Sequence, residues 1–213
     1  MTSKTEELAD AQAGRVEHPT RTALVDTAIQ LIDAKGPEGL TAEEVLSTSG
    51  VSNGSLYHHF DAFDELLLTA QVRRATRHVD EDIAVLKSLM DAAQSSDEFF
   101  ELVASLTHVS LSDERADRRL ERVQILGAVQ RRPEFLEAMG FEQQRLTNAL
   151  TALIDQGKER GWVADDLDTG VVAVFLQAAI LGSILNDIMP TPIAPKRLEN
   201  FVTTIFNEVL RPH

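Results

Sequence analysis

Apolar residues recur every three or four positions along most of the chain, and stretches that alternate apolar and polar residues are scarce. The first spacing is that of an amphipathic helix and the second that of a strand, so an all-α protein is predicted. Glycine, proline and capping residues divide the pattern into segments. Long helices are expected over residues 20–35, 61–90, 95–106, 112–129, 133–160, 166 or 168 to 189, and 195–210.

Two short helices joined by a tight turn are predicted between residues 40 and 60. Thr41 and Glu44 have the spacing of a capping box, so the first short helix begins at Thr41. Gly50 supplies the positive φ that ends this helix, and Ser52 caps the next one. Two helices with so short a connection have the layout of a helix-turn-helix that reads DNA.

The register of the two short helices separates an inner face from an outer one. The residues expected to meet in the interior are Leu46, Val51 and Leu56. The residues expected on the exposed, hydrogen-bonding face are Asn53, Ser55, Tyr57 and His58. An exposed face with these side chains is suited to contact base edges and phosphates.

This segment closely resembles the N-terminal signature of the tetracycline-repressor (TetR) family. The residues that match it in place are Leu40, Thr41, Gly50, Val51, Ser52, Gly54, Leu56, Tyr57, His59 and Phe60. The pair Val45-Leu46 stands where the family usually has Ile-Ala. The resemblance covers residues 21–67 and is architectural beyond them.

The resemblance implies an N-terminal three-helix helix-turn-helix domain and a larger C-terminal helical domain for ligand binding and dimerisation, about nine helices in all. We therefore expect a disordered arm over residues 1–18, a DNA-binding domain over residues 19–65 and a ligand-binding and dimerisation domain over residues 66–213. The implied function is that of a ligand-responsive regulator, a repressor that a small molecule releases from a pseudo-palindromic operator.

The predicted contacts to double-stranded DNA lie in the turn and the second short helix. Tyr57 and His59 match family positions that commonly hold the phosphate backbone, while Asn53 can bond a base edge or a phosphate. The full set is Thr41, Ser52, Asn53, Ser55, Tyr57, His58 and His59. Capping alone would also explain Thr41 and Ser52, and packing under the turn would explain His59.

The last two predicted helices are apolar on more than one face, which indicates a partner chain. In the TetR family these helices pair with their copies across a two-fold axis, so a homodimer is expected. The expected interface residues are Val172, Ala179, Leu198, Phe201, Val202, Ile205 and Phe206. The alternative is that the whole run is buried within one chain. Residues 171–185 are too short and too interrupted for a membrane span, so no membrane is expected.

Resemblance to the family also implies a small-molecule pocket between the C-terminal helices. The candidate lining residues are Phe100, Val103, Thr107, Leu126, Phe135, Met139, Phe175 and Gln177. Core packing would explain every apolar member equally well, but an amide such as Gln177 inside an apolar helix needs a polar partner. An apolar or aromatic effector is expected.

Charge is the feature that disagrees with DNA binding. The chain has a net charge of −14, and no Lys or Arg lies between Thr41 and Glu65. Because attraction to phosphate dominates DNA affinity, this surface should bind weakly or depend strongly on sequence. Nearby basic residues of the arm, the first helix and the connector could compensate, namely Arg15, Arg21, Lys35, Arg73, Arg74 and Arg77. The alternative function is an all-helical small-molecule-binding protein that has lost DNA binding.

Other chemistry is sparse. The chain has no Cys, hence no disulfide or thiol nucleophile, which suits a reducing cytoplasm. Side chains adjacent on a helix, such as His58 and His59, diverge by about 100°, so we expect no metal site. No catalytic constellation or cofactor motif stands out, so neither an enzyme nor a cofactor is expected. Arg115, Arg118, Arg119 and Arg122 are expected to form a solvated helix face, with anion sensing as the alternative.

Overall fold

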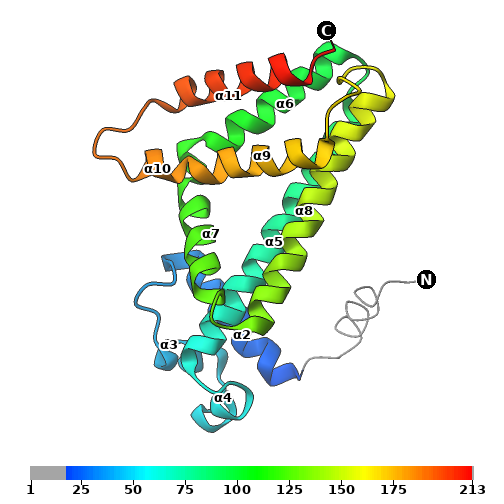
Figure 1. Ribbon diagram of the computed structural model, residues 1–213. Helices are drawn as coiled ribbons and strands as arrows, with labels where there is room; N and C mark the ends of the chain where they lie inside the picture. Colours follow the sequence, from blue (N-terminus) through cyan, green and yellow to red (C-terminus); the bar gives the residue numbers. More distant parts are fainter. Residues whose placement is uncertain (1–17, 213) are drawn as a thin grey trace, which may run out of the picture. The chain divides into compact units, whose positions relative to one another are not determined.

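The structure, a computed structural model, describes residues 18–212. These residues form the helices α2 (Pro19–Lys35), α3 (Ala42–Ser49), α4 (Asn53–His59), α5 (Phe63–Ala92), α6 (Ser96–Leu111), α7 (Ala116–Val129), α8 (Pro133–Glu159), α9 (Thr169–Gly182), α10 (Ile184–Asp187) and α11 (Pro195–Leu210), with a short 3-10 helix, η1 (Asp113–Arg115), before α7 (Figure 1). No strand occurs among these residues, so the all-α prediction is confirmed. Of the arm predicted over residues 1–18, residues 1–17 lie outside the described residues, and His18 caps α2.

The chain divides into two compact units, Met1–Arg74 and Ala75–His213. In the first unit, α2 packs on α3 and α4, and the beginning of α5 completes the core. The buried members of this core are Leu24, Val25, Ala28, Ile29, Ile32, Leu40, Val45, Leu56, Phe60, Leu66 and Ala70. A three-helix head with its own apolar core can hold α4 rigidly at the surface.

The capping signals of the sequence are present in the structure. Thr41 and Glu44 form the predicted capping box. Gly50 ends α3 with a φ of 69°, and the Ser52 hydroxyl accepts from the backbone N–H of Ser55. The next helix begins later than expected, at Phe63.

In the second unit, α8 packs against α7 and α9, and α11 packs against α6. The buried core residues of this unit are Val79, Leu86, Ala93, Phe99, Phe100, Val103, Leu146, Leu150, Leu153, Ile154, Val163, Ala173, Phe206 and Leu210. The helix predicted to reach residue 189 ends at Gly182, and a single further turn, α10, follows. The Ser183 hydroxyl and backbone N–H both bond to the Ile180 carbonyl, at 2.7 and 3.3 Å, which tightens and ends the helix.

Arg119 holds the start of α7 to its neighbours. Its Nε and Nη2 donate to the two carboxylate oxygens of Asp187 at 2.8 and 2.9 Å. Its Nη1 donates to the carbonyls of Ser110 and Ser112 at 2.8 and 3.1 Å. With only 4% of its surface exposed, Arg119 corrects the expectation of a solvated arginine face on this helix. Its bonds to α10 and to the end of α6 explain why a charge is tolerated in the interior.

Gly157 in α8 packs closely against Val163 and Phe99. A Cβ at this position would lie 2.8 Å from Val163 Cγ2 and 3.1 Å from Phe99 Cζ. We expect Gly157→Ala to lower the free energy of unfolding by about 1–3 kcal/mol through overpacking. Gly140, also in α8, has open space around its Cα, so Gly140→Ala should raise stability by about 0.5–1 kcal/mol. Urea denaturation of both variants measures the contrast, and equal effects would contradict the packing argument.

Candidate DNA-binding surface and effector domain

The second short helix, α4, presents three of the seven predicted DNA contacts to solvent. Asn53, Tyr57 and His58 are exposed, and 52% of the Tyr57 surface is accessible. The Ser52 hydroxyl is bonded to the Ser55 backbone N–H at 3.2 Å and to the Ser55 hydroxyl at 2.9 Å. The two serines are therefore engaged in capping α4, and the outer face is formed by the other three residues.

His59 lies half-buried in a cluster of histidine rings. Its ring centroid is 4.8 Å from that of His18, at the start of α2, and 5.0 Å from that of His58. The guanidinium of Arg21 lies 4.8 Å above the ring of Phe60. Partial burial, and then the neighbouring His18, His58 and Arg21, lower the pKa of the His59 imidazole. His59 thus packs under the turn and also borders the exposed face.

The acidic groups nearest α4 in sequence lie on α3 and around the start of α5, and further ones lie on α2. A hydrogen bond from Lys35, with the capping bonds to Thr41, lowers the pKa of the Glu44 carboxyl and keeps it ionised within an ion pair. The Glu65 carboxylate accepts the backbone N–H of Asp61 at 2.7 Å. The exposed face of α4 carries no acidic residue, although the helices around it do.

Two of the arginines expected to compensate for this acidity, Arg73 and Arg74, have acidic partners within the same unit. Arg74 Nε donates to Asp33 at 2.8 Å, and Arg73 lies 3.6 Å from Asp26. Both acidic residues belong to α2, so these pairs hold α2 against α5. Their positive charge is offset locally, which leaves the head with little net attraction for phosphate.

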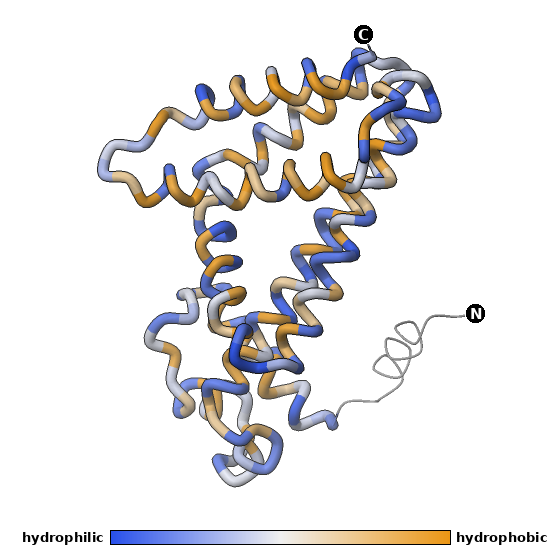
Figure 2. Tube along the Cα trace, viewed as in Figure 1, coloured by the Kyte–Doolittle hydropathy of each residue, from blue (hydrophilic) through white to orange (hydrophobic). Residues whose placement is uncertain are grey.

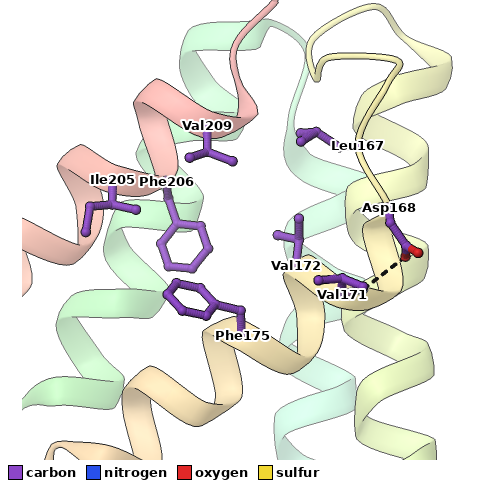
Figure 3. Close-up of a pocket in the computed structure, with 8 residues that line it drawn as sticks. All are labelled: Leu167, Asp168, Val171, Val172, Phe175, Ile205, Phe206 and Val209. Carbon is purple, nitrogen blue, oxygen red and sulfur yellow. Dashed lines mark hydrogen bonds between the residues drawn. The ribbon is translucent and has the colours of Figure 1, made fainter.

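The candidate effector residues of the second unit fall into three environments. Phe100, Val103, Thr107 and Met139 are buried in packed interior positions, whereas Leu126 and Phe135 are half-buried. Phe175 is exposed on α9, where its ring faces that of Phe206 in α11 at a centroid distance of 6.2 Å (Figure 3). The structure therefore separates Phe175 from the interior group.

Gln177 is part of a polar network between α8 and α9. Its side-chain oxygen accepts from Gln143 Nε2 at 2.6 Å, and its Nε2 donates to Thr147 Oγ1 at 3.0 Å and to the Ala173 carbonyl at 3.1 Å. Arg122 of α7 donates to Gln143 Oε1. The sequence indicated that Gln177 needs a polar partner but not which one. The spacing of Gln143 and Thr147, four residues apart on α8, was the signal available.

The faces of α9 and α11 carry the predicted interface residues. Within one chain Phe206 is buried, Phe201 is 66% exposed, and the others are half-buried, namely Val172, Ala179, Leu198, Val202 and Ile205. A groove of about 260 Å³ between the two helices is lined by Leu167, Asp168, Val171, Val172, Phe175, Ile205, Phe206 and Val209 (Figure 3). Hydrophobic residues dominate α9 in Figure 2.

The segment Thr169–Asp187 is long and apolar enough to cross a membrane by length and composition alone. Only Ala173 and Asn186 within it are buried in this chain. The buried helix expected from the sequence is therefore mostly half-buried in the single chain, with several exposed apolar side chains. Among residues 18–212, no group of three or more His, Asp or Glu side chains is placed to hold a metal ion.

Comparison with known proteins shows similarity to bacterial transcriptional regulators. Residues 24–70 match the family model "Bacterial regulatory proteins, tetR family". The HTH-type transcriptional regulator UidR of Escherichia coli is 22% identical over 176 residues, which cover 83% of this chain and 85% of that protein.

Solved structures show the same fold at low sequence identity. Salmonella enterica GusR superposes with a TM-score of 0.58 at 19% identity, covering 92% of this chain and 98% of that one. A transcriptional regulator from Saccharomonospora viridis, solved in complex with choline, has a TM-score of 0.64 at 20% identity, covering 91% and 98%. The chain is therefore a DNA-binding transcriptional regulator, and its residues 24–70 match the tetR family of bacterial regulatory proteins.

Proposed function

We propose that this regulator acts in the cytoplasm as a homodimeric repressor, bound to a pseudo-palindromic operator and released when a small molecule binds the Ala75–His213 unit. The observation that carries the proposal is the pair of exposed faces on one chain. One face is the polar, uncharged surface of α4, and the other is the apolar surface of α9 and α11. The first suits DNA and the second suits another copy.

The apolar face supports a homodimer. Its exposed large side chains are Val171, Val174, Phe175, Leu185, Ile188 and Phe201. A monomer seldom leaves so many neighbouring apolar side chains in water, and a second copy of the same face can cover them. A lipid bilayer is the competing cover, but Gln177 near the middle of α9 is engaged with α8, and α9 ends at Gly182.

A dimer also meets the demands of DNA recognition. One helix as short as α4 contacts only a few base pairs, whereas two related by a two-fold axis and about 34–36 Å apart reach successive major grooves. We assign Asn53 to a base edge and Tyr57 and His58 to the backbone, with Thr41, Ser52, Ser55 and His59 at the margin. Because the head offers little electrostatic attraction, specificity would rest on these contacts.

The effector is assigned to the interior of the second unit. Leu126, Phe135 and Met139 supply apolar contacts, and the network around Gln177 supplies polar ones. The presence of choline in a regulator of the same fold supports a small-molecule ligand. Selection of the full chain against a random duplex library tests the DNA half of the proposal. An enriched inverted repeat is expected, and enrichment of no sequence would favour the alternative of a ligand-binding protein without an operator.

The dimer gives the first prediction for this assembly. Light scattering should give the wild type about twice the 23.5 kDa chain mass. Phe201→Glu should shift the mass to that of one chain, because the carboxylate would lie unpaired in an apolar interface. Leu136→Glu is the matched control, since Leu136 is an exposed leucine of α8 outside this face. A monomeric wild type, or equal effects of both variants, would contradict the interface.

Two substitutions on α4 separate backbone contacts from base contacts. Tyr57→Ala should weaken operator binding by about 1–3 kcal/mol with unchanged base preference. Asn53→Ala should instead relax preference at one position in each half-site. Thr48→Ala, at an exposed position of α3, is the control. Fluorescence anisotropy against operator variants measures both effects. If both α4 variants bind like the wild type, the assignment of α4 to the major groove is wrong.

The histidine cluster predicts that DNA binding depends on pH. Because the pKa of His59 is lowered, its imidazole is neutral in the free head at pH 8. A nearby phosphate favours the charged form, so binding takes up a proton, and affinity should rise as the pH falls from 8 to 6. For one proton the rise is at most about tenfold per pH unit. His59→Gln should flatten the dependence, whereas His108→Gln, in the other unit, should not. A flat wild-type profile would exclude a phosphate beside this cluster.

A further inference from the structure

Two arginines one turn apart on α7 have opposite surroundings. Arg119 is fully paired with Asp187 and two backbone carbonyls. The guanidinium of Arg122 makes a single hydrogen bond to the protein among the described residues, to the Gln143 side chain. No carboxylate of residues 18–212 forms an ion pair with it, and Asp82 is the charged group whose field reaches it. Arg119 therefore has a full set of hydrogen-bond partners within the fold, whereas Arg122 has one within residues 18–212.

The position of Arg122 is costly for a charge that lacks a counter-ion. Burial lowers the pKa of its guanidinium, and Asp82 counteracts the shift. Arg122 is half-buried, and a charge taken partly out of water without a paired partner destabilises a fold, so such a residue is retained where something else pairs with it. Arg115 already contacts Asp82, at 3.8 Å, and the field of Arg118 also reaches it, so Asp82 is shared among three arginines. The remaining N–H groups of Arg122 are therefore available to a ligand.

We propose that Arg122 binds the carboxylate of the effector. This rests on the effector half of the proposed function. A guanidinium presents two parallel N–H donors that match the two oxygens of a carboxylate. The negative charge of Asp82 nearby disfavours a doubly charged phosphate, so a singly charged acid fits better.

The neighbours of Arg122 define the rest of this acid. Gln143, Gln177 and Thr147 form a hydrogen-bonded group beside the guanidinium, and Gln143 can exchange its bond to Arg122 for one to the ligand. Leu126 and Met139 lie one turn from Arg122 and Gln143 on the same helix faces, and both are apolar. The ligand class is therefore a small organic acid with an apolar body. This refines the apolar effector expected from the sequence by adding a single negative charge.

Matched ligand pairs test the proposal without knowledge of the natural effector. Octanoate is compared with octanamide, and phenylacetate with phenylacetamide, by their effect on thermal unfolding of the full chain. The single tryptophan, Trp162, packs against Phe99 in the core of this unit and reports the transition. We expect the wild type to bind at least one carboxylate about 10- to 100-fold more tightly than its amide. Arg122→Met should abolish this preference.

Two further variants control for charge and for folding. Arg118→Met removes one positive charge from α7 at a residue paired with Glu81 at 3.0 Å, and it should keep the carboxylate preference. Without ligand, Arg122→Met should leave the melting temperature unchanged or raise it, whereas Arg119→Met should lower it by orphaning Asp187. Any of three results overturns the proposal. They are no carboxylate preference in the wild type, a preference retained in Arg122→Met, and equal destabilisation by Arg122→Met and Arg119→Met.

The operator selection with the wild type is scored separately from this series. If an operator is enriched but the wild type shows no carboxylate preference, the acid-site proposal is wrong and the repressor proposal stands. If the wild type prefers carboxylates but no operator is enriched, the acid-site proposal stands and the repressor proposal is wrong. The two proposals therefore fail in distinguishable ways.

Discussion

The structure depends above all on how α9 divides its apolar surface between two neighbours. One face packs on α8, where Ala173 is buried, and α9 also contacts α6, whereas Val171, Val174 and Phe175 stay exposed in a single chain. Burial of apolar surface is the dominant favourable term in folding and association, so a helix of this composition is stable in water only when both sides are covered. The groove shared with α11 shows that the same constraint extends across two helices (Figure 3).

The helix-turn-helix could be predicted from the sequence almost residue by residue because local chemistry determines it. The capping box of Thr41 and Glu44, the positive φ of Gly50 and the Ser52 cap each act over three or four residues. The match of α11 to residues 195–210 has the same origin, since Pro195 fixes where that helix begins. Boundaries that depend on weaker signals were less accurate, and the end of α9 at Gly182 is the example.

What the sequence could not provide was the partner of each polar side chain. Arg118, Arg119 and Arg122 follow one another within two turns and look equivalent as letters. The structure makes Arg119 a buried clamp on Asp187, Arg118 a surface partner of Glu81, and Arg122 a guanidinium with one amide neighbour. These differences arise from contacts 20 to 70 residues away along the chain, which periodicity does not encode. The same holds for Arg73 and Arg74, whose charges α2 offsets.

Gln177 and Phe175 lie two residues apart on α9, so their side chains leave the helix in widely different directions. One belongs to the network beside Arg122, and the other lines the face assigned to a partner chain. In the proposed dimer, a ligand that displaces the Gln177 side chain would turn or shift α9, whose other face is assigned to the partner chain. The second protomer would then meet an altered interface before it binds its own ligand. In such a dimer α9 would couple the two effector sites. Effector binding is then expected to be cooperative, with a Hill coefficient above unity.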